Sequence, residues 1–82
     1  MRKLERDEKI KAGDIIMVDT RLSKYAIIIT RVTKTLSIGV LKDSENKHEY
    51  KFPSIYGFGF GLRPKVKWNT NIYEIFRKEE NE

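Results

Sequence analysis

The sequence predicts an all-β protein, a small barrel of about five antiparallel strands. Short segments rich in β-branched and aromatic residues recur along the 82 residues, and turn-forming residues separate them. The chain contains no Cys, so neither disulfides nor thiolate metal sites stabilise so small a domain. A closed or partly open barrel would supply a compact core and would leave few exposed strand edges.

Three of the expected strands lie in the first half of the chain. Gly13 and Asp14 precede the apolar segment 15–18, which we expect to be the first strand. Residues 25–32 (YAIIITRV) form a nearly continuous β-branched run, typical of a strand buried on much of both faces. Residues 36–41 alternate as a returning strand. The inward side chains of that strand would be Leu36, Ile38 and Val40, and the outward ones Ser37 and Gly39.

The second half continues this pattern. Residues 42–47 (KDSENK) have the composition of a turn, and residues 48–52 alternate again before Pro53. Residues 72–76 (IYEIF) fit a short final strand, although their apolar positions also fit one turn of helix. We expect one barrel domain over residues 12–76, a charged N-terminal arm over 1–11 and a charged C-terminal tail over 77–82.

Residues 56–68 (YGFGFGLRPKVKW) are the most unusual stretch of the chain. In an extended strand, their even positions would form an aromatic and aliphatic ridge. Their odd positions would form a glycine strip that ends in three cations. Pro64 cannot donate to a strand ladder and could reset this alternation.

Two segments resemble known families. Residues 11–18 (KAGDIIMV) resemble the opening of KOW-type and related SH3-like barrels, in which a Gly-Asp pair begins an alternating first strand. The further glycines of a KOW motif are missing from residues 22–25. Residues 29–35 (ITRVTKT) are similar to a segment of small uncharacterised bacteriophage proteins. The resemblance implies an SH3-like barrel, and because such modules often bind RNA, DNA or proteins of the ribosome and polymerase, it implies a binding function.

The residues that catalysis requires are scarce. With one His and no Cys, a Ser–His–acid triad could use only His48, which lies in a charged turn. Asp43, Glu45 and Glu49 are too few, and lack the glycine bend, for a Ca²⁺ loop. Neither phosphate-loop pattern is present among the glycines of residues 57–61. We therefore expect no enzyme, no cofactor and no metal site.

Charge favours a polyanionic partner. Lys and Arg number 17 against 12 acidic residues, for a net charge of +5. The first hypothesis is a non-catalytic nucleic-acid-binding module of low sequence specificity, for DNA or RNA. Its phosphate contacts would be Arg63, Lys65 and Lys67, supported by Arg31, Lys34 and Lys51. Tyr56 is a candidate for stacking on bases, and the pattern leaves open whether its ring is buried or exposed.

A protein-interaction module is the alternative. A small phage-type protein that binds or inhibits a host protein would present an apolar patch, and residues 56, 58 and 60 (Tyr, Phe and Phe) are the candidates. In that case the cationic row would be a solvated strand face that blunts a sheet edge. No apolar run is long enough to span a bilayer and the N-terminus is too charged for a secretory signal, so we expect a soluble, cytoplasmic protein. The oligomeric state stays open.

Overall fold

The chain folds as a single antiparallel sheet. The computed structural model describes residues 1–20, 22–45, 47–57 and 72–79. These residues form six strands and no helix, and the strand order in the sheet is β1-β6-β2-β3-β4-β5. The strands are β1 (Arg2–Lys3), β2 (Ile15–Asp19), β3 (Lys24–Val32), β4 (Leu36–Leu41), β5 (Tyr50–Pro53) and β6 (Ile72–Arg77). The all-β prediction is confirmed, and the open question over residues 72–76 is resolved in favour of a strand.

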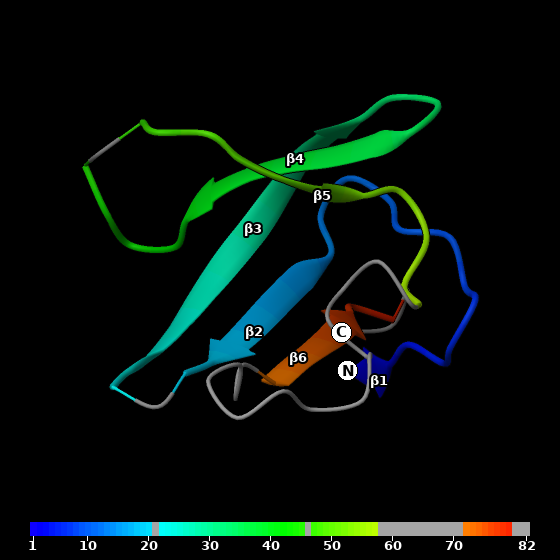
Figure 1. Ribbon diagram of the computed structural model, residues 1–82, viewed down its shortest axis with the longest axis horizontal. Coiled ribbons are helices and arrows are strands. Elements are labelled where there is room, and N and C mark those ends of the chain that lie inside the picture. Colours follow the sequence, from blue (N-terminus) through cyan, green and yellow to red (C-terminus); the bar gives the residue numbers. More distant parts are fainter. Residues whose placement is uncertain (21, 46, 58–71, 80–82) are drawn as a thin grey trace.

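The sheet bends along β3. Figure 1 shows β6 beside β2 and β2 beside the first half of β3, whereas β4 pairs with the second half of β3 and, with β5, runs in a different direction from β2 and β6. The register between β3 and β4 shifts at Ile29/Arg31, so that Thr30 is an extra residue on β3. A bulge of this kind increases the local twist and bends a strand. The bend lets one sheet fold around its own core.

The core lies against the inner face of the central strands. Ile16 and Val18 of β2, Ile27 and Ile29 of β3 and Ile75 of β6 are each at most 1% exposed. They occupy alternate positions, because successive side chains of a strand point to opposite faces. Four aromatic rings pack against this cluster: Tyr25, Tyr50, Phe52 and Tyr73.

The register of β4 differs from the predicted orientation, although Ile38 is buried as predicted, at 3% exposure. Ser37 and Gly39 face the core, and Leu36, Ile38 and Val40 belong to the opposite face. Ser37 is fully buried, and its hydroxyl donates to the carbonyl of Pro53 at 2.8 Å. A Cβ at Gly39 would lie 2.5 Å from the carbonyl oxygen of Ile28, so only a residue without a side chain fits there. The apolar pattern of β4 was misleading because its two smallest residues, Ser37 and Gly39, point toward the core.

The N-terminal segment 1–11 is part of the fold and not a solvated arm. Its β1 pairs with β6, and Leu4 and Ile10 are buried at 2% and 3% exposure in the core cluster. Lys9 then forms a β-bridge with Ile55, just beyond β5. The segment after the edge strand β1 is thus hydrogen-bonded to the segment after the other edge strand, β5. The sequence did not reveal this role, since only two large apolar residues stand among the charges.

A polar network holds the end of β6 against the entry to β2. The buried carboxylate of Asp14 accepts two hydrogen bonds from the Arg77 guanidinium, each of 2.9 Å, and one from the backbone N–H of Lys11 at 2.8 Å. Arg77 also donates to Glu8 and to the carbonyl of Lys9. The hydrogen bond to Asp14 is the main cause that raises the pKa of Arg77. Because the polar atoms of this network are hydrogen-bonded to one another, we infer that the network stabilises the fold and does not bind a ligand.

None of the described residues belongs to a helix long and apolar enough to cross a membrane.

Candidate functional site

The outer face of the central strands carries an apolar surface. Cross-strand pairing places Ile15 between Ile28 and Phe76 in one row, and Met17 beside Ala26 in the next. Partners in a register point to the same side of a sheet, so these five side chains share one face. We call them the outer apolar patch. Met17 is 37% exposed, and the other four are half-buried.

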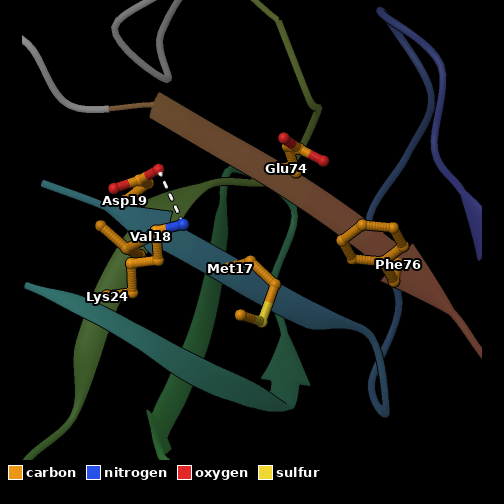
Figure 2. A pocket seen from close by; sticks show the side chains of 6 residues that line it. All are labelled: Met17, Val18, Asp19, Lys24, Glu74 and Phe76. Atoms are coloured by element: carbon orange, nitrogen blue, oxygen red, sulfur yellow. Dashed lines mark ion pairs between the residues drawn. The ribbon is translucent and has the colours of Figure 1, made fainter.

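Charged residues border this patch. Figure 2 shows the hollow beside Met17 and Phe76, with Asp19 from β2, Lys24 from β3 and Glu74 from β6 around it. Lys24 and Asp19 form an ion pair of 3.7 Å. A neighbouring hollow shares Met17 and Phe76 and extends to Ile15, Ala26, Met1 and Lys42. An apolar centre within a charged border is the usual composition of a protein contact surface.

Two of the predicted cationic residues lie together farther along the same sheet face. Arg31 and Lys51 are both register partners of Ile38, on β3 and β5 respectively, so they flank it on either side of β4. Ile38 is only 3% exposed but is not part of the core cluster. The aliphatic stems of long cationic side chains can cover such a neighbour while their charges stay in water. We call Arg31 and Lys51 the basic row.

The members of the basic row differ in their pairing. The Arg31 guanidinium lies 3.4 Å from the Glu49 carboxylate, and both side chains are largely exposed. Lys51 has no ion-pair partner among the described residues. An exposed ion pair of this kind contributes little free energy, so Arg31 can exchange its carboxylate for a phosphate.

Lys34 lies apart from this row. It is in the turn between β3 and β4 and lines a hollow with Lys9, Ile10 and Ile55. Of the three supporting cations, only Arg31 and Lys51 share a register row.

Tyr56 is not an exposed stacking residue. Its side chain is 8% exposed and belongs to the core cluster, and its hydroxyl donates a 2.6 Å hydrogen bond to the carbonyl of Tyr73. Burial is the main cause that raises the pKa of this phenol. A ring packed on both sides offers no open face to a base, so this prediction is corrected.

The other candidates of the glycine-aromatic stretch fall outside the described residues. These are Phe58, Phe60, Arg63, Lys65, Lys67 and Trp68.

His48 lies in the connection between β4 and β5. The imidazole of His48 packs edge-on against the ring of Tyr50, with the ring centroids 4.9 Å apart. Within the part of the chain that the structure describes, no group of three or more His, Asp or Glu side chains could hold a metal ion.

Comparison with protein families, with characterised proteins and with solved structures finds no match to this chain. Sequence reasoning missed the outer apolar patch. The sequence did contain an indication of this patch, because Ile15 and Met17 make the outer face of β2 apolar in addition to its inner face.

Proposed function

We propose that the protein is a non-catalytic nucleic-acid-binding module of low sequence specificity. The observation that carries the proposal is the basic row, in which Arg31 and Lys51 point from one sheet face with Ile38 between them. Two cations about two strand spacings apart, or roughly 10 Å, can contact successive parts of a phosphate backbone without reading bases. Lys34 adds positive charge nearby, and Arg63, Lys65 and Lys67 remain candidate contacts from the sequence.

An SH3-like barrel is the form of the fold that we propose for this function. The bend at the β3 bulge and the bridge between Lys9 and Ile55 support it, because they bring the two edges of the sheet toward one another. Small barrels of this type bind single-stranded nucleic acid on a strand face.

Fluorescence anisotropy with a labelled single-stranded oligonucleotide, at several salt concentrations, tests the proposal. The variant Arg31→Glu/Lys51→Glu should weaken binding. It should also make the negative slope of log affinity against log salt less steep by about 1.4, which is about 0.7 for each phosphate that a cation no longer neutralises. The control Lys47→Glu/Lys78→Glu changes the net charge equally at exposed positions outside the basic row. Equal weakening in both variants would show that net charge alone drives binding and would contradict a specific basic row.

A protein-interaction module is the second candidate, and the outer apolar patch favours it. Of the expected patch at residues 56, 58 and 60, Tyr56 is buried and the other two lie outside the described residues. Met17→Lys places a charge at the centre of the patch, at a position exposed enough to leave the core intact. Affinity capture should retain a stoichiometric host protein with the natural sequence and lose it with Met17→Lys. Equal retention by both proteins would contradict this use of the patch.

A further inference from the structure

The charges around the outer apolar patch are sorted by sign. Lys24 and Lys42 lie on the side of β3 and β4, whereas Asp19 and Glu74 lie on the side of β2 and β6. Lys42 continues the row of Met17 and Ala26, because its N–H donates to the carbonyl of Ala26 at 2.9 Å. The patch therefore has cations along one border and carboxylates along the other.

One cation lies on the acidic side. Lys3 of β1 forms an ion pair of 3.5 Å with Glu74, and the two side chains are 56% and 43% exposed. An ion pair so exposed to water contributes little free energy, and it leaves the Glu74 carboxylate able to accept a second cation. Lys42, on the opposite border, has no carboxylate partner among the residues that the structure describes.

We propose that this face joins two copies of the chain in a two-fold symmetric dimer, with the axis running along the strands between β2 and β3. Such an axis preserves position along the strands and lays β2 of one copy over β3 of the other. It also lays β6 over β4. The inference rests on the second candidate function and identifies its partner as a second copy of this chain.

The register then brings opposite charges together. Glu74 of one copy lies over Lys42 of the other, and Asp19 over Lys24, each twice by symmetry. In the same row as Glu74 and Lys42, Met17 lies over Ala26. In the row on the far side from Asp19, Ile15 lies over Ile28. Sheets that pack face to face lie about 10 Å apart, a gap that side chains from both faces fill.

Self-complementarity favours a second copy over an unrelated protein. In a two-fold interface each surface patch meets itself, so charges of opposite sign must stand at equal distances on either side of the axis. An unrelated partner imposes no such relation. The apolar centre supplies the attraction, and the sorted borders fix the orientation.

Sedimentation equilibrium of the full chain over a range of protein concentrations tests the dimer. The natural sequence should associate. Lys42→Glu or Glu74→Lys alone places like charges at two symmetric positions, so each should weaken association by about tenfold to a hundredfold. The double variant Lys42→Glu/Glu74→Lys re-forms both pairs with reversed sign and should recover most of the affinity.

Two further variants complete the experiment. Lys47→Glu, in the exposed connection between β4 and β5, should leave association unchanged. Met17→Lys should abolish it. A natural sequence that is monomeric up to its solubility limit would overturn the dimer, as would a double variant no better than the singles. A monomer that still captures a host protein through Met17 would overturn the dimer while supporting the second candidate function, so the two failures are distinguishable.

Discussion

The two faces of β2 differ in what their side chains contact. On the inner face, Ile16 and Val18 are at most 1% exposed and pack within the core. On the outer face, Ile15 and Met17 are partly open and lie among side chains of their own sheet. The same strand therefore contributes one set of side chains to the core and leaves the other set partly exposed, where the proposed contacts would form. Burial, and not residue type, decides which role an isoleucine has, because the free energy gained scales with the apolar area removed from water.

The largest expected effect on stability comes from substituting an isoleucine by alanine on the inner face, compared with the same substitution on the outer face. Ile16→Ala should lower the free energy of unfolding by about 2–5 kcal/mol, because it removes a fully buried side chain and leaves a cavity. Ile15→Ala, on the half-buried face, should cost about 1 kcal/mol. Urea denaturation followed by circular dichroism measures both. Equal losses would mean that the outer face is as tightly packed as the core and would remove the distinction between them.

A smaller effect distinguishes the buried carboxylate from an exposed one. Asp14→Ala leaves the Arg77 guanidinium, which is 20% exposed, without its main partner, and should lower the free energy of unfolding by about 2–4 kcal/mol. Asp19→Ala breaks only the exposed pair with Lys24 and should cost about 0–1 kcal/mol. Thermal and urea unfolding give both values. A loss at Asp14 no greater than that at Asp19 would show that the network with Arg77 does not stabilise the fold.

Glycines give the next comparison. Gly39→Ala would force a Cβ to within 2.7 Å of Ile27 Cγ2 on the inner face and should cost about 1–3 kcal/mol. Gly13→Ala meets nothing within 4 Å, but Gly13 has a φ of +94°, so only the backbone strain of about 1 kcal/mol remains. The midpoints of urea unfolding should rank the two in that order. The reverse order would mean that backbone conformation outweighs packing at these sites.

The smallest effect concerns Glu8 at the surface. Hydrogen bonds from the Arg2 guanidinium, and then from the Glu5 backbone N–H, lower the pKa of Glu8 from 4.5 to about 2. Because the folded state has the lower pKa, this stabilisation is present above pH 4.5 and is lost as the pH falls toward 2. The urea midpoint should therefore decrease less between about pH 5 and pH 2 in Glu8→Gln than in the natural sequence. Parallel decreases would show that the contact with Arg2 does not persist in solution.

Strand positions could be predicted from the sequence because β-branched runs and turn residues mark them locally. The expected segments 15–18, 25–32 and 36–41 correspond to β2, β3 and β4 with shifts of at most one residue. Orientation was harder. In β4 the inner positions are Ser37, Gly39 and Leu41, and no local signal reveals that a glycine must accommodate a neighbouring backbone. Leu4 and Ile10 were missed for a related reason, since their burial depends on strands distant in the sequence.

For the candidate site residues the structure gives only their positions. Arg31 and Lys51 lie on either side of β4, whereas Tyr56 is part of the core. A cation on a strand is usually exposed, because burial of its charge needs a carboxylate partner such as the one that Asp14 gives Arg77. An aromatic residue is exposed only if the core is already filled by others, which a single sequence does not show.

Pairing between the two ends of the chain has a kinetic consequence. The contact between Asp14 and Arg77 spans 63 positions, and β2 pairs on one side with β3, its neighbour in the chain, and on the other with β6. The strands β2 to β5 form successive antiparallel pairs through short connections, so they can assemble first, while β6 must close a long loop before it docks. During synthesis on the ribosome, the edge of β2 that pairs with β6 would therefore stay unpaired until residue 77 has emerged. During that interval the edge of β2 is open to pairing with another nascent chain.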